Sequence, residues 1–79
     1  MLIDIVLPKV GMAMQDGTIV AWHKAVGDLV EKGEALFELE TEKVSMQVES
    51  PDEGELAEIL VPAGETVDVD TVVARLKVE

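Results

Sequence analysis

With 79 residues, the chain is long enough for one small domain only, and its hydrophobic core must be modest. It has no cysteine, which excludes disulfide bonds, thiolate metal sites and thiol catalysis. Its formal net charge of -11 argues against nucleic acids and anionic membranes as partners, because both would repel it. The acidic side chains favour a basic partner surface, or simply keep a small domain soluble.

The chain begins with MLIDIVLPKV, which lacks the basic start and long apolar run of a signal peptide. It also lacks the Arg- and Ser-rich character of a transit peptide. No apolar run elsewhere approaches the length of a transmembrane helix. We therefore expect a soluble intracellular protein that forms one domain over residues 1–79.

Short runs with the composition and periodicity of β-strands follow one another along the chain. They comprise residues 3–7, 18–23, 35–40, 44–50, 55–61 and 72–78. The run at 44–50 alternates most clearly, with Val44, Met46 and Val48 on one face and polar side chains on the other. Gly or Pro lies in most of the gaps, and no window of helical length has a glycine-free amphipathic stripe. The sequence therefore predicts an all-β domain with essentially no helix.

An internal repeat relates the two halves of the chain. A shift of 37 positions aligns residues 17–39 with residues 54–76, so that apolar positions fall on apolar positions. Two glycine pairs coincide in this alignment, Gly17 with Gly54 and Gly27 with Gly64. The repeat predicts two similar half-domains of about four strands each, closing with pseudo-twofold symmetry over a Val/Ile/Leu core. The expected shape is a flattened barrel or sandwich.

The two halves meet at a short connection that contains Lys43. Only a few residues separate the strand at 35–40 from the strand at 44–50, which favours a hairpin turn. Lys43 is then exposed at the tip of this turn, and the chain termini lie at the opposite end. Leu39, Val44, Met46 and Val48 should anchor the two strands as core residues. From the spacing alone, a lysine in such a turn is usually an ordinary charge that protects a sheet edge from aggregation.

No self-contained catalytic or metal site is visible. His23 is the only histidine and lies within a strand run, which favours a structural role. The segments PDEGE and DVD lack the spacing of a calcium loop, and no glycine-rich phosphate-binding loop occurs.

The sequence ETEKVSMQVESPDEG around Lys43 resembles the lipoyl domains of the acyltransferase (E2) components of 2-oxo acid dehydrogenase complexes. The resemblance extends from Leu7 to Leu76. In that family the modified lysine most often follows Asp and precedes Ala or Val. Here Glu42 and Val44 flank Lys43, and Glu42 keeps the charge of the commoner Asp. The resemblance implies the biotinyl/lipoyl-domain-like fold, known as the single hybrid motif, with two four-stranded sheets.

The resemblance also implies a function. Lipoic acid would be joined by an amide bond to the Nζ of Lys43, by a lipoate ligase or by an octanoyltransferase and lipoyl synthase. The resulting arm would accept an acyl group from the thiamin-diphosphate-dependent dehydrogenase (E1) and deliver it to coenzyme A at the E2 core. The flavoprotein dihydrolipoyl dehydrogenase (E3) would reoxidise it. The domain itself would be a monomeric carrier and not an enzyme, cytoplasmic in a bacterium or in the mitochondrial matrix of a eukaryote.

Candidate contacts with these partners lie near Lys43. The resemblance places a loop that E1 recognises at residues 9–17, where Met12 and Met14 are candidate exposed contacts, although Met often fills gaps in a core. Acidic residues including Glu40 and Glu49 would steer the domain towards basic patches on its partners, or would simply form a solvated face.

Two alternatives stay open at this point. A biotinyl carrier domain of a biotin-dependent carboxylase presents its lysine in the same hairpin, but typically between two methionines. An unmodified β-sandwich interaction module would use Lys43 only as a surface charge. Within the E2 family, the opening PKVGMAMQDGTIVAW is more similar to pyruvate or acetoin complexes than to the 2-oxoglutarate type. E2 chains normally continue into further domains, so we expect these residues to be part of a longer protein.

Overall fold

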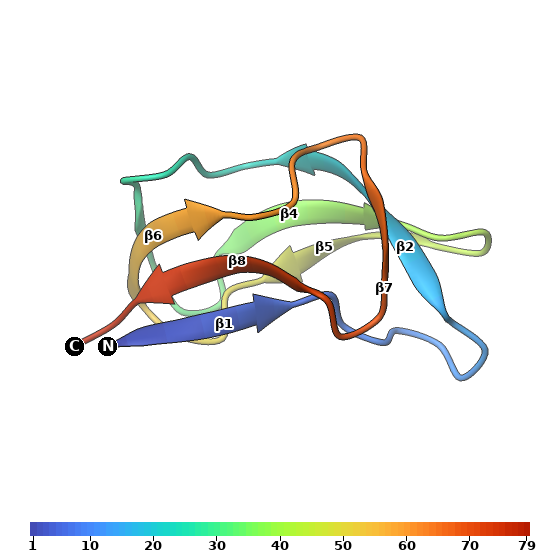
Figure 1. The fold of residues 1–79 in the computed structure, drawn as a ribbon, viewed down its shortest axis with the longest axis horizontal. Coiled ribbons are helices and arrows are strands. Elements are labelled where there is room, and N and C mark those ends of the chain that lie inside the picture. Colours follow the sequence, from blue (N-terminus) through green and yellow to red (C-terminus); the bar gives the residue numbers. More distant parts are fainter.

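The computed structural model describes residues 1–79 as two four-stranded antiparallel sheets that face each other (Figure 1). The strands are β1 (Leu2–Val6), β2 (Asp16–Trp22), β3 (Leu29–Val30), β4 (Ala35–Glu40), β5 (Ser45–Glu49), β6 (Gly54–Ile59), β7 (Thr66–Asp68) and β8 (Val72–Lys77). One sheet has the order β1-β8-β6-β3 and the other β5-β4-β2-β7. The predicted all-β sandwich is therefore confirmed. The structure contains no helix that is long and apolar enough to span a membrane.

The six strand runs predicted from periodicity correspond to β1, β2, β4, β5, β6 and β8. Their ends differ from the predicted ends by two residues at most. Strands β3 and β7 were implied only by the expected four strands in each half. Each has no more than three residues, which is too short to show an alternation of apolar and polar side chains.

The offset of 37 positions is also the offset of the structural repeat. Gly27 and Gly64 occupy equivalent turns with φ angles of 97° and 94°. Gly33, with φ of 86°, is matched by Asp70, with φ of 71°. This left-handed region suits Gly and, among other residues, Asp and Asn. The two pseudo-symmetric turns therefore have the same backbone shape despite different residues.

A strand of each half forms backbone hydrogen bonds with a turn of the other half. The N–H of Ile19 donates to the carbonyl of Glu65 at 3.0 Å, and the N–H of Gly64 donates back to Ile19 at 2.6 Å. Equivalent bonds join Leu56 to the turn at residues 27–28, at 2.8 and 2.9 Å. Because each half supplies backbone partners to the other, neither half satisfies its own hydrogen bonds alone.

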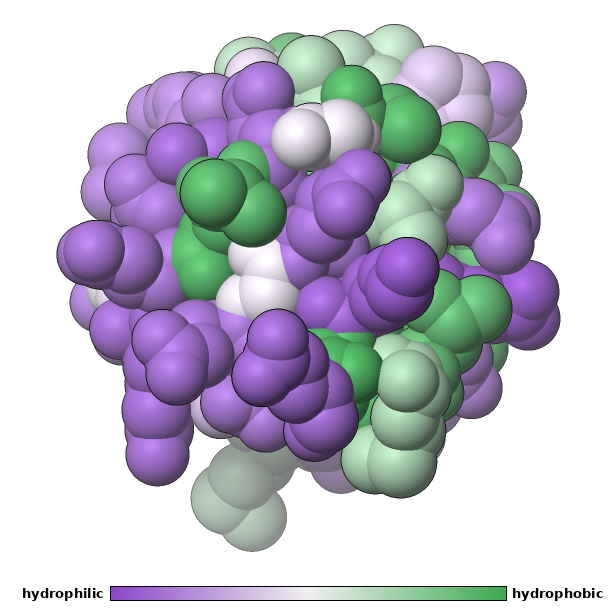
Figure 2. Space-filling view, turned by 90° about the vertical axis from the view of Figure 1, so that its left-hand side faces the viewer, coloured by the Kyte–Doolittle hydropathy of each residue, from purple (hydrophilic) through white to green (hydrophobic).

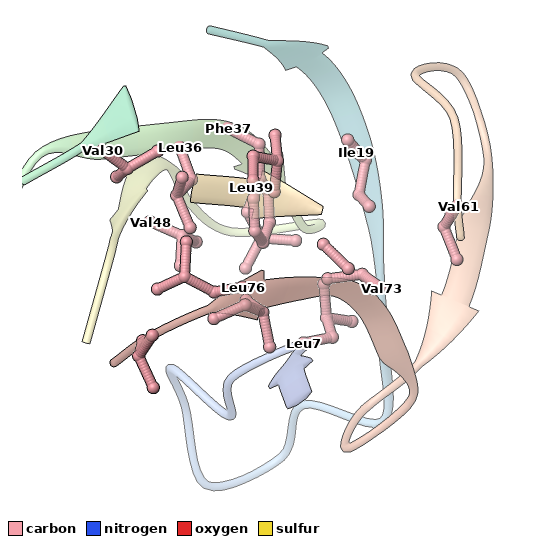
Figure 3. Packing of buried hydrophobic residues seen from close by; sticks show 14 residues of the cluster. Leu7, Ile19, Val30, Leu36, Phe37, Leu39, Val48, Val61, Val73 and Leu76 are labelled. Carbon is pink, nitrogen blue, oxygen red and sulfur yellow. The ribbon is translucent and has the colours of Figure 1, made fainter. Parts of the chain in front are cut away.

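The core between the sheets consists of 14 buried apolar residues, chiefly Val, Leu and Ile (Figure 3). Phe37 is fully buried, and its ring centroid lies 4.8 Å from that of Trp22 at a tilt of 49°. The indole Nε1–H of Trp22 donates to the carbonyl of Val61 at 2.9 Å. The two large rings of the chain thus pack together, and the indole also bonds across to the second half.

Gly54 lies where a side chain has no room. A Cβ at this position would overlap the backbone carbonyl of Lys77, which cannot move without disturbing β8. We expect Gly54→Ala to lower the free energy of unfolding by about 1–3 kcal/mol, as overpacking does. Urea denaturation would measure this. Gly11→Ala is the matched control, because nothing lies within 4 Å of the added methyl. Equal stability of the two variants would contradict the expectation.

Glu34 closes the turn after β3. Its Oε1 accepts the N–H of Glu31 at 3.0 Å, and its Oε2 lies 3.0 Å from the Nζ of Lys24. The hydrogen bond from the Glu31 backbone, followed by the one from Lys24, lowers the pKa of Glu34 below its ordinary value. The charged carboxylate therefore stabilises the folded state at neutral pH.

Glu34→Gln should consequently lower stability at neutral pH but have less effect in acid. The stabilisation is complete above the ordinary pKa of a glutamate and is lost as the pH falls through the lower pKa of folded Glu34. Since the carboxylate is partly exposed, the effect should be small and should weaken with salt. Urea titrations at pH 7 and at about pH 3 would test this. A stability difference between wild type and variant that grows in acid would contradict the assignment.

The molecule is elongated, with extents of 35 × 20 × 19 Å. Both termini lie at one end, and the turn that joins β4 to β5 projects from the other, as predicted (Figure 1). At the terminal end, the N–H of Val78 donates to the carbonyl of Met1 at 2.8 Å. Figure 2 shows this end as a largely hydrophilic surface with small separate hydrophobic areas. The surface around Lys43 thus lies away from the points where further chain would attach.

Candidate functional site

Residues 41–44 form the turn between β4 and β5, and Thr41 holds it in shape. The backbone N–H of Thr41 donates to the carbonyl of Val44 at 2.8 Å. The Oγ1 of Thr41 accepts the N–H of Lys43 at 3.3 Å and that of Val44 at 3.2 Å. The same hydroxyl donates to the Val44 carbonyl at 3.3 Å. One side chain therefore bonds three of the backbone groups of the turn.

Lys43 is exposed in this turn, as the sequence predicted. The ion pairs of the molecule lie elsewhere, between Lys24 and Glu34, between His23 and Glu38, and from Arg75 to two carboxylates. No carboxylate oxygen lies within 4.0 Å of the Lys43 Nζ. The amine is therefore unpaired and accessible, on a backbone that the two paired strands and Thr41 hold in place.

The prediction that four apolar residues beside the turn belong to the core was only half right. Leu39 is fully buried and Val48 is 9% exposed. Val44 and Met46, in contrast, are 40% and 38% exposed. They lie on or beside β5, an edge strand with no neighbour on its outer side, so its apolar face is only partly covered near the turn.

A groove separates the turn from the loop between β1 and β2. It has a volume of about 390 Å³ and is lined by residues 10–16 of the loop and residues 41–44 of the turn. Both segments lie at the same end of the molecule (Figure 1). The structure thus brings the loop that the sequence singled out next to Lys43.

The two methionines of this loop have different surroundings. Met12 is 98% exposed. Met14 is partly buried against the core, and its Sδ accepts the N–H of Val10 at 3.3 Å. The Met12 side chain is therefore accessible at the surface, whereas Met14 fills the space beneath the loop.

The acidic candidate residues lie at different distances from Lys43. Glu42 is exposed in the turn, and Glu40 is exposed at the end of β4 that leads into it. Glu49 lies at the other end of β5, where it pairs with Ala35. Of the candidates, Glu40 and Glu42 therefore surround Lys43, and Glu49 does not.

His23 follows directly after β2. Its Nε2 lies 3.9 Å from the Oε1 of Glu38. No three His, Cys, Asp or Glu side chains are arranged to hold a metal ion. The geometry thus offers a presented amine and an adjoining groove.

Comparison with known proteins agrees with this arrangement. The family described as "Biotin-requiring enzyme" matches residues 3–76. The chain is 44% identical over 76 residues to the dihydrolipoyllysine-residue acetyltransferase component of the acetoin cleaving system of Bacillus subtilis. It is 45% identical over 73 residues to the acetyltransferase component of the pyruvate dehydrogenase complex of Corynebacterium glutamicum. These matches cover 96% and 92% of the chain but only 19% and 11% of the two relatives.

A solved structure shows the same fold. The lipoyl domain of the 2-oxoglutarate dehydrogenase complex of Azotobacter vinelandii superimposes with a TM-score of 0.79, at 36% identity and with 96% of both chains covered. The chain therefore belongs to the family of biotin- and lipoyl-carrying domains, within which it is a lipoyl domain. Such a domain is a carrier of covalently bound lipoic acid, as the sequence resemblance implied. The exposed and unpaired amine in the turn fits this cofactor.

Sequence reasoning missed Thr41. A signal was present, because Thr at the start of a short turn often bonds to backbone groups two or three residues further on. Its importance here depends on three bonds from one hydroxyl, which only the folded turn reveals.

Proposed function

We propose that Lys43 is the residue that carries the lipoyl group, within one domain of a longer acyltransferase chain. The observation that carries this proposal is the free, exposed amine in a turn fixed by Thr41. The other four lysines lie outside this turn. When bound, the dithiolane of lipoate supplies the acyl-carrying chemistry.

The chain's own residues supply placement and recognition. Strands β4 and β5, paired from Glu40–Ser45 to Ala35–Glu49, hold the turn at a fixed position. The exposed carboxylates of Glu40 and Glu42 give this end a negative potential that would attract basic partner surfaces. Because the termini lie at the far end, a linker to further domains would leave the turn accessible.

We infer that the partners are E1, the E2 catalytic core, E3 and the lipoate-attaching enzymes. Relatives of the acetoin, pyruvate and 2-oxoglutarate types are equally similar, at 44–45% identity, so the preference for an acetyl-transferring complex rests on the opening PKVGMAMQDGTIVAW. The biotinyl alternative has less support, because Lys43 lies between Glu42 and Val44 and not between methionines.

Intact mass spectrometry tests the proposal. After incubation with lipoate, ATP and a lipoate ligase, wild-type protein should gain the mass of one lipoyl group, and Lys43→Arg should gain none. Avidin blotting after exposure to a biotin ligase should be negative. Unmodified wild-type protein, or an added mass that survives Lys43→Arg, would overturn the assignment.

Thr41→Val should slow this modification without unfolding the domain. The substitution keeps the shape of the side chain but removes the acceptor for the N–H groups of Lys43 and Val44. These groups are exposed to water, so we expect a stability loss of at most about 1 kcal/mol. The initial rate of lipoylation should fall several-fold more than that of Thr41→Ser, which keeps the hydroxyl. Equal rates for the two variants would contradict a positioning role.

A further inference from the structure

We propose that the groove between residues 10–16 and residues 41–44 binds the lipoyl group of Lys43 on its own domain when no partner is present. This inference rests on the proposed attachment at Lys43 and goes beyond it. The arm would then have a resting position and would not extend into solvent at all times.

The size and position of the groove support this assignment. Its volume of about 390 Å³ lies within the range of roughly 300–1,000 Å³ that is usual for small-molecule sites. Lys43 itself forms part of its wall. A group attached to the Lys43 Nζ is therefore held close to the groove, and this tethering raises its effective concentration there.

The chemistry of the wall matches the arm better than other small ligands. Acylation of Lys43 removes its charge and adds an aliphatic chain that ends in a ring with two sulfur atoms. Apolar side chains that face this space include Met12, which is 98% exposed, and Val44, which is 40% exposed. Covering them with the arm would remove apolar surface of both from water. The flexible thioether of Met12 can adapt to the shape of the ring.

The charges at the groove argue against a free anion as its ligand. Asp16 and Glu42 both line it, and once Lys43 is acylated no cationic side chain remains among the lining residues. A carboxylate or phosphate would be repelled there. The uncharged arm would not, and it is the one apolar group that the proposed function delivers to this place.

Nuclear magnetic resonance of the lipoylated protein tests the inference directly. With ¹³C-methyl methionine labels, we expect nuclear Overhauser contacts between the Met12 methyl group and the protons of the dithiolane ring. Met1 is the internal control, because it is 78% exposed but lies at the opposite end of the molecule. Its methyl group should show no such contact.

A variant of Met12 shows whether the groove restrains the arm or whether the two are merely close to each other. With ¹⁵N-lysine labels, the side-chain amide of lipoylated Lys43 gives its own signal, whose relaxation reports the motion of the arm. Met12→Ser should leave the fold intact, since the side chain is exposed, and should increase this motion. If mass spectrometry shows lipoyl on Lys43 but the Met12 contact is absent and the motion is the same in both proteins, the inference fails while the proposed function stands. A protein without lipoyl on Lys43 would overturn both.

Discussion

Exchanging positions 42 and 43, as the double variant Glu42→Lys/Lys43→Glu, is expected to lower the rate of lipoylation by about 100-fold or more. The exchange keeps composition and net charge, so electrostatic attraction to the ligase is preserved. It moves the amine by one residue along the turn, away from the position whose backbone N–H donates to Thr41 Oγ1. Displacing a reacting group by about 1 Å can cost a factor of roughly 100. Intact mass spectrometry at short times would give the initial rates.

The control for this experiment is a measurement showing that the double variant is folded. Both exchanged residues are exposed, so thermal unfolding of the double variant should match that of wild type. If the folded variant is lipoylated at a rate within a few-fold of wild type, the ligase recognises the charge around the turn and not the position of the amine. That result would contradict the expectation.

Reductive acylation by the cognate E1 should be about 10- to 1,000-fold more efficient with the lipoylated domain than with free lipoamide. The reason is that the negative surface around Lys43 would raise the rate of encounter with a basic E1 surface, by a factor of this size. The comparison is of kcat/KM with the same E1, 2-oxo acid and thiamin diphosphate. The advantage should shrink as the salt concentration rises.

A matched pair of variants localises this effect. Glu40→Gln and Glu49→Gln remove the same charge, but Glu40 adjoins the turn and Glu49 lies at the far end of β5. Glu40→Gln should therefore lower kcat/KM more than Glu49→Gln. Equal values for the domain and free lipoamide would show that the protein surface adds nothing to recognition.

The fold could be predicted largely because the chain repeats itself. Gly27 and Gly64, aligned from sequence, adopt the same left-handed turn. The strand at 35–40 was predicted with its observed bounds because its apolar residues and flanking glycine are clear. Strand β3 could not be predicted from periodicity, because two residues are too few to show an alternation of apolar and polar side chains.

The surroundings of Lys43 were harder to predict. The exposure of Val44 and Met46 depends on β5 being an edge strand, which a single strand's sequence does not show. The difference between Met12 and Met14 depends on how the loop folds back on the core, where Met14 Sδ meets the N–H of Val10. The groove exists only because the fold brings two distant segments together.

The most direct test of the account is peptide mapping by tandem mass spectrometry of protein made in cells that synthesise lipoate. The chain has five lysines, and one of them lies in the turn that the structure presents. We predict lipoyl on Lys43 and on no other lysine. A lipoyl group found on Lys9, Lys24, Lys32 or Lys77, or a fully unmodified chain, would contradict the account.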